Sequence, residues 1–282
     1  MIRVAEIAKN LSNLVHALRD VSGNHMEIFV ISITALFASG LTLFSGFGLG
    51  TLLMPVVAIF FPVEIAIAIT ATVHLANNIF KVALLGKKAN RSVLLSFGIT
   101  AIASAFFGAL VLGWLSGIPP IFEYAAFGTQ MQVSPLNLVV GILILTFIIL
   151  ELSPGFSSLA LDRKYLPYGG VISGFFGGLS GHQGAFRSMF LLKSGLSKEE
   201  FVATGVMLAV MVDVSRMLIY GWEMTGRHHI IQWSLVIAAS VSAFIGAYFG
   251  SKLLKKITIR AVQRAVSIML VMISLGLISG VL

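Results

Sequence analysis

The sequence predicts an all-α polytopic membrane protein with two inverted-topology repeats, each with a Gly-rich broken (re-entrant) segment followed by three transmembrane helices. Three observations predict this fold class. The chain contains long runs without charge, the first half aligns with the second at an offset of 135 positions, and glycines cluster at matching places in the two halves.

The apolar runs are too long for a soluble domain. Hydrophobic residues make up 57% of 282 positions and charged residues only 11%. No Asp, Glu, Lys or Arg occurs in residues 28–63, 92–122, 124–150 or 265–282. A helix crosses the hydrocarbon layer with about 20 apolar residues, so these runs are long enough to do so. They also lack the period-two alternation of transmembrane barrels.

The basic charges lie in short loops. The net charge is +8, and the basic loop residues are Lys87, Lys88, Arg91, Arg163, Lys164, Lys252, Lys255, Lys256, Arg260 and Arg264. By the positive-inside rule these loops face the cytoplasm, so the charge reports orientation in a lipid bilayer and no nucleic-acid partner is expected. The chain has no cysteine, which excludes disulfides and thiolate metal sites.

The N-terminal segment differs from the rest. Residues 1–27 combine charged and apolar positions in a helical pattern, without the continuous apolar core of a signal peptide. We expect an amphipathic surface helix lying on the bilayer.

The chain repeats itself. Residues 45–86 align without a gap on residues 180–221, and the rare polar residues agree as well, with Lys81 on Arg216 and Asn78 on Asp213. Two homologous halves follow. We place the first repeat at 28–152, a connecting loop at 153–166 and the second repeat at 167–282.

Each half then contains one Gly-rich broken segment and three spans. The broken segments are 28–61 and 168–195, and the spans are 64–85, 92–115, 135–152, 199–220, 231–251 and 261–281. Three spans are an odd number, so the second half is predicted to be inverted. Inverted repeats with interrupted helices are typical of secondary transporters, which bind their substrate between the repeats.

Glycines are concentrated where the broken segments would unwind. They occur in Ser45–Gly50, which includes Gly46 and Gly48, and in Gly177–Gly184, which includes Gly181. An unwound segment would present the N–H groups of the next half-helix, which is an arrangement that binds anions. The alternative is that the glycines only allow close helix packing.

Polar residues follow on the next helices. His74, Asn77, Asn78 and Lys81 share one helix face, and Asp213 and Arg216 stand at i and i+3. Charges deep in a membrane are costly and usually functional. Asp213 and Arg216 could instead form a structural ion pair, and Lys81 could extend to the interface.

These considerations give a set of candidate residues. The substrate-binding candidates are Arg187, Gln183, His182, Gly181, Gly184, Lys81, Asn78, Gly46, Gly48 and Arg216. Arg187 is the leading one, because a planar guanidinium suits an oxyanion. Proton-coupling candidates are His74 and Asp213, with His182 as a further carrier.

Enzymatic functions are not expected. The sequence contains no His-x-x-x-His, Gly-x-Ser-x-Gly or phosphate-binding loop motif. We therefore predict no cofactor, no metal and no hydrolysis of ATP by this chain.

The motifs resemble those of the TauE/SafE family. The resemblance rests on the glycines before Pro55, on the stretch Gly178–Ser188, on Ala203–Gly205 and on Val212–Arg216, and it covers about residues 28–280. The second half departs from the family pattern, with Gln183 and Ala185 where glycines are common and Phe190 in place of proline.

The resemblance implies a transporter of sulfite, sulfonates or other small organosulfur anions in the bacterial inner membrane, often an exporter. The residues alone leave an anion-selective channel as the alternative, since it could share the same cationic lining. A homodimer is a candidate state, because small helical transporters often dimerise.

Overall fold

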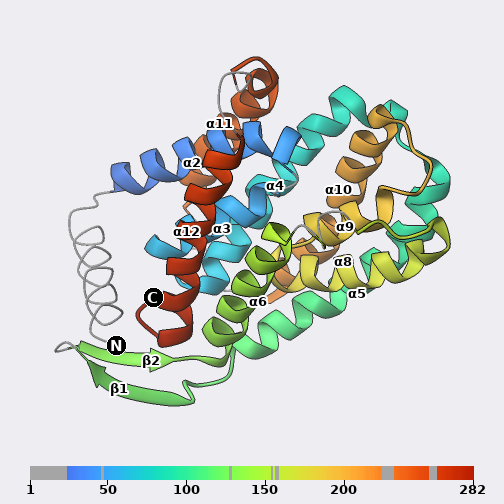
Figure 1. The fold of residues 1–282 in the computed structure, drawn as a ribbon. Coiled ribbons are helices and arrows are strands. Elements are labelled where there is room, and N and C mark those ends of the chain that lie inside the picture. Colours follow the sequence, from blue (N-terminus) through green and yellow to red (C-terminus); the bar gives the residue numbers. More distant parts are fainter. Residues whose placement is uncertain are drawn as a thin grey trace.

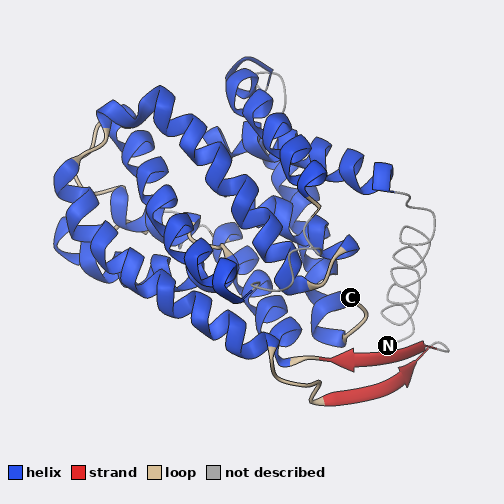
Figure 2. Cartoon of the chain, turned by 180° about the vertical axis from the view of Figure 1, so that it is seen from behind, coloured by secondary structure: helices blue, strands red, loops and turns tan. Residues whose placement is uncertain are grey.

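The protein is helical apart from one hairpin (Figures 1 and 2). The computed structural model describes residues 24–45, 48–126, 129–153, 155, 159–223, 232–253 and 259–282. The first half contains α2 (Asn24–Ser45), α3 (Leu49–Phe60), α4 (Val63–Leu85), η1 (Gly86–Lys88), α5 (Arg91–Ser116), β1 (Phe122–Ala126), β2 (Thr129–Val133) and α6 (Pro135–Leu152). The second contains η2 (Arg163–Tyr165), α8 (Leu166–Ser180), α9 (Gly184–Leu191), α10 (Lys198–Glu223), α11 (Trp233–Leu253) and α12 (Ile259–Ser279).

The observed helices agree with the six predicted spans. Each corresponding helix begins and ends within three residues of its predicted bounds. Each broken segment is a helix, a short break and a shorter helix: α2 and α3 in the first half, α8 and α9 in the second. Residues 1–23, which make up nearly all of the predicted N-terminal surface helix at 1–27, lie outside the described residues.

Three described helices are long and apolar enough to cross a membrane. By length and composition these are Val63–Lys88, Arg91–Ser116 and Lys198–Trp222, and shorter apolar helices accompany them. Large apolar side chains also face outward, with Trp114 at 68% and Leu218 at 67% exposure. An outer surface this apolar is suited to lipid, so the chain is a predominantly helical membrane protein.

Helices of one half pack on helices of the other. Helix α5 packs along α8, and α2 packs along α11, so each pair joins the two halves (Figure 1). Helix α4 contacts α10, and α6 contacts α12. The two halves are therefore interleaved, and the breaks after α2 and α8 are brought into one central region.

Small residues allow the closest of these contacts. A Cβ at Gly174 or Gly178 of α8 would collide with the backbone of Ala101 or Ala105 of α5. In the other pair, a Cβ at Gly246 of α11 would collide with the carbonyl group of Leu36 in α2. Backbone approach of this kind is typical of membrane helix interfaces.

We expect Gly174→Leu to destabilise the protein by about 2 to 3 kcal/mol, because the added side chain must push two backbones apart. Thermal unfolding in detergent measures this. Gly221→Ala is the matched control, since Gly221 lies in helix α10 and is exposed. The control should unfold at or above the wild-type temperature. Equal unfolding temperatures for both variants would contradict the close α5–α8 contact.

Side chains stabilise the starts of three helices. The Asn90 side chain accepts a hydrogen bond from Val93 N (3.2 Å) at the start of α5, and Ser134 Oγ accepts from Asn137 N (3.1 Å) at the start of α6. At α10, Ser197 and Glu200 form a reciprocal capping box, which the sequence analysis did not identify.

The β1–β2 hairpin was not predicted. It pairs Phe122 with Val133 and lies over the C-terminal end of α12, where Tyr124 Oη donates to the carbonyl oxygen of Ser279 (2.5 Å). Met131 and Val133 are buried on one of its faces. The alternation of apolar and polar residues in these five-residue strands was present in the sequence. It is short, however, and it lies between two long apolar runs that indicate helices.

Candidate functional site

The break between α8 and α9 is made by a left-handed glycine. Helix α8 ends at Ser180, and Gly181 has φ +83°, which L-residues with a Cβ adopt at a cost. Gly181 N donates to the carbonyl of Gly177 (3.0 Å) and closes the helix. The chain then turns through His182 and Gln183, and α9 begins at Gly184.

We expect Gly181→Ala to harm both folding and any function of the break. Besides the strained φ, its Cβ would stand 2.9 Å from Arg216 Nη1. Gly195→Ala is the control, because Gly195 has a similar φ of +80° with nothing within 4 Å of an added Cβ. In thermal unfolding the control should lose about 1 kcal/mol and Gly181→Ala clearly more. Equal losses would show that the Arg216 contact is unimportant.

Two side chains in the break leave polar atoms unsatisfied. His182 and Gln183 are 3% and 2% exposed. Neither His182 Nε2 nor Gln183 Nε2 has a hydrogen-bond partner within the described part of the chain. Buried polar atoms are nearly always paired, so two orphans side by side at a helix start indicate a place for a ligand or water.

Arg187 lies one turn into α9 and reaches back to the break. Its Nη1 donates to Gln183 Oε1 (3.3 Å), and its Nε lies 3.7 Å from where a Cβ of Gly205 in α10 would stand. Arg187 is partly buried. This hydrogen bond is to a neutral amide, and among the described residues no carboxylate lies within ion-pair distance of Arg187.

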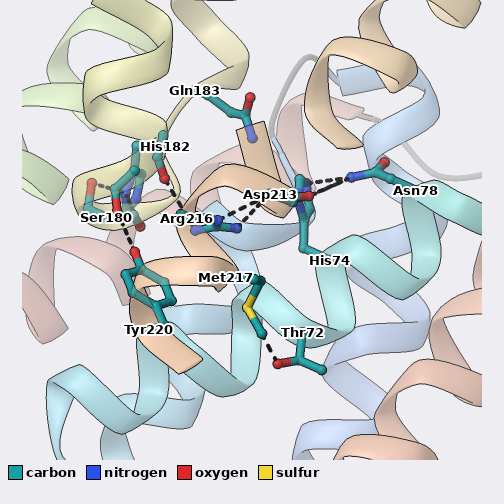
Figure 3. Close-up of polar contacts among 12 residues, drawn as sticks. Thr72, His74, Asn78, Ser180, His182, Gln183, Asp213, Arg216, Met217 and Tyr220 are labelled. Carbon is teal, nitrogen blue, oxygen red and sulfur yellow. Dashed lines mark hydrogen bonds and ion pairs between the residues drawn. The ribbon is translucent and has the colours of Figure 1, made fainter. Parts of the chain in front are cut away.

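Asp213 is the centre of a buried polar network (Figure 3). Its Oδ1 accepts from Arg216 Nε (3.0 Å) and Nη2 (2.7 Å), and its Oδ2 lies 2.6 Å from His74 Nδ1 and 3.4 Å from Asn78 Nδ2. Asp213 is 0% exposed and Arg216 is 1% exposed. The network joins α4 of the first half to α10 of the second.

Arg216 and Tyr220 bind the C-terminal carbonyls of α8. Arg216 Nη1 donates to the carbonyl of Gly177 (3.3 Å), and Tyr220 Oη donates to that of Gly178. Both therefore complement the negative end of the α8 dipole. Tyr220 was not among the predicted residues, although it stands four residues after Arg216 and so shares its helix face.

Lys81 is buried among helices. It is 6% exposed, so it does not extend to the surface. With the Asn77 amide oriented to satisfy its neighbours, Asn77 Oδ1 accepts from Lys81 Nζ (3.1 Å). Lys81 is also near enough to Arg187 for the two cations to repel each other. The polar face of α4 that contains Lys81 thus brings a second cation to the region of Arg187.

The first-half break meets the second-half break. An added Cβ at Gly50, in the first turn of α3, would stand 3.5 Å from the carbonyl oxygen of Gly181. Gly48 is the N-terminal cap residue of α3 and has extended backbone. Gly46 lies outside the described residues. The two breaks, 135 positions apart, therefore adjoin in space.

The structure brings most of the predicted residues into one region. Arg187, Gln183 and His182 lie on or next to the α8–α9 break, while His74, Asn78, Asp213 and Arg216 form the adjoining network. Within the described ranges, no group of three or more His, Asp or Glu side chains could hold a metal ion. The arrangement supplies hydrogen-bond donors and positive charge.

The fold and this region together define a class of protein. It is a predominantly helical membrane protein with buried cations where two helix breaks adjoin. Residues 31–277 match the sequence model of the family described as sulfite exporter TauE/SafE. The chain belongs to this family, which is one of membrane transporters. No curated protein and no solved structure matches the chain.

Proposed function

We propose that the protein is a secondary transporter that binds a small sulfur oxyanion, sulfite or a sulfonate, at the α8–α9 break and exports it across the bacterial inner membrane. The family's description supports the sulfur anion and the direction. The main support for this site is the position of Arg187, a partly buried cation beside the unpaired Gln183 amide nitrogen. A planar guanidinium and a side-chain N–H together complement an oxyanion.

The proposed ligand contacts come from both halves. Arg187, Gln183 and His182 contact the anion directly, with backbone N–H groups at Gly184 and the first turn of α3 near Gly48 facing it. Lys81 adds positive charge, and Asn78 lies beside it. Arg216, engaged with Asp213 and Gly177, contributes charge and holds Gly181 in place.

The proposed movement is alternating access between two inverted repeats. The interleaved packing of α5 on α8 and of α2 on α11 supports this model, since equivalent helices exchange partners between the halves. The adjoining breaks at Gly50 and Gly181 support a substrate position at the repeat interface. Coupling to protons is part of the proposal.

Radiolabelled sulfite uptake into proteoliposomes tests this function. We expect saturable uptake that sulfoacetate and thiosulfate compete for more strongly than sulfate does. Protein-free liposomes, measured at the same pH, control for passive permeation of sulfite. Large single-molecule currents would identify an anion-selective channel instead. Absence of sulfite uptake above that of protein-free liposomes, repeated with labelled sulfoacetate, thiosulfate and sulfate, would contradict the proposed substrate class.

A further inference from the structure

The tautomer of His182 is fixed by its surroundings. Its Nδ1 lies 3.1 Å from the carbonyl oxygen of Ser180, which can only accept a hydrogen bond, and 3.1 Å from Ser180 Oγ. The hydroxyl proton of Ser180 is donated to the carbonyl of Phe176 (3.3 Å), so Oγ also acts as an acceptor here. Both neighbours require a proton on Nδ1, whatever the charge of the ring.

The opposite nitrogen is therefore a free lone pair when the ring is neutral. Nε2 is buried and has no partner among the residues that the structure describes. The ring is held in place by Phe147 of α6, whose plane stacks on it at 5.1 Å and 2°. A hydrogen-bond donor would satisfy Nε2. A proton bound to Nε2 would instead make this atom a donor.

The other proton-carrying candidates are already engaged. His74 Nδ1 and Asp213 Oδ2 lie 2.6 Å apart, and Asp213 Oδ1 accepts twice from Arg216. Of the three titratable groups, only His182 presents an unpaired atom at the break.

Few charged groups face His182. Arg216 of α10 acts on the ring electrostatically, and its charge is balanced by Asp213. Arg187 lies five residues further on, in α9, and is bonded to Gln183. Phe147 is the α6 residue that stacks on the ring. The charged groups named here that are not paired with a carboxylate are therefore cationic. A proton that reached His182 alone would be repelled by this positive charge, whereas the charge of a proton that arrived with an anion would be neutralised by the anion.

We infer that His182 Nε2 is the atom that accepts the one proton carried with each transported anion, either as a hydrogen bond or by proton transfer, so that the ligand taken up is a singly protonated oxyanion or its equivalent, an oxyanion plus a proton. In the first case the O–H of the anion donates to Nε2. In the second the proton passes to Nε2, and the resulting N–H donates to the anion. The net charge moved is the same. This inference rests on the proposed function and specifies the form of its substrate.

Two substitutions divide the ring's functions. His182→Asn keeps an N–H near the position of Nδ1, facing Ser180, and removes Nε2. His182→Gln carries an amide group to the position of Nε2 that does not titrate. Both remove the proton acceptor, and neither alters Arg187, Gln183 or the Asp213 network.

The test is the number of protons moved per sulfite in proteoliposomes that contain an internal pH dye, measured together with radiolabelled uptake between pH 6.5 and 8. We expect one proton per anion from the wild type. We expect a loss of proton movement and a flattened pH profile in both variants, with measurable sulfite uptake remaining in at least one. His182→Asn with unchanged proton stoichiometry would overturn the inference.

Further outcomes separate this inference from the proposed function. Sulfite uptake by the wild type without proton movement would overturn the inference and the proposed proton coupling, and would leave the proposed anion transport standing. A uniform reduction of flux by both variants, with an unchanged pH profile, would mean that His182 is purely structural and would also overturn it. Absence of any oxyanion flux in the wild type would instead contradict the proposed function. Thermal unfolding of each variant verifies that it is folded.

Discussion

Arg187→Ala is expected to reduce saturable sulfite uptake about 30- to 160-fold while the protein remains folded. A hydrogen bond between charged partners contributes about 2 to 3 kcal/mol, which corresponds to this loss. Arg187 is a partly buried cation that donates a hydrogen bond to the neutral Gln183 side chain. Removing it therefore leaves no buried carboxylate without its ion-pair partner, so stability should change little.

Two controls sharpen this prediction. Arg187→Lys keeps the charge but loses the planar, two-pronged donor, and it should restore only part of the uptake. Arg163→Ala removes an exposed arginine that bonds to Ser92, outside the proposed site, and uptake should remain at the wild-type level. Wild-type uptake by a folded Arg187→Ala variant would show that Arg187 does not bind the anion.

Asp213→Ala is expected to destabilise the protein by about 3 to 5 kcal/mol, the largest stability effect that we predict. The substitution leaves the Arg216 guanidinium and the His74 ring buried without their shared acceptor. Removing one partner of a buried ion pair costs this much because the remaining charge is uncompensated. Thermal unfolding in detergent, followed by size-exclusion chromatography, measures the loss.

The double variant Asp213→Ala with Arg216→Met tests the cause. Removing both charges should recover part of the stability lost in Asp213→Ala, because no buried charge remains unpaired. Recovery should be incomplete, since Arg216 also donates to the carbonyl of Gly177. If the losses of the single variants Asp213→Ala and Arg216→Met simply add, the two residues are not coupled, and an unpaired buried charge is not the cause of the loss in Asp213→Ala.

Much of the fold could be predicted from the sequence. Apolar runs long enough to cross a membrane indicated the helices, so that elements such as α5 and α6 were located closely. The breaks at Gly48 and Gly181 could also be located, because clustered glycines are unfavourable inside helices. These features are local, and local patterns are visible in one sequence.

The contacts across the chain could not be predicted in the same way. His74 and Asp213 are 139 positions apart, and nothing in either helix specifies that their side chains meet at 2.6 Å. The stripe of polar residues on α4 indicated only that a partner was needed. The contact of Tyr220 with Gly178 and the position of Gln183 over Gly177 likewise depend on how α8 packs against α10.

The most direct test of the central claim is to locate the anion itself. Selenite shares the pyramidal shape and charge states of sulfite, and its selenium is visible by anomalous diffraction from crystals of the full chain. We predict one selenium position at the start of α9, placed so that the selenite oxygens accept hydrogen bonds from Gln183 Nε2 and Arg187. A selenium position elsewhere in the protein, with this break ordered and empty of selenium, would contradict the account.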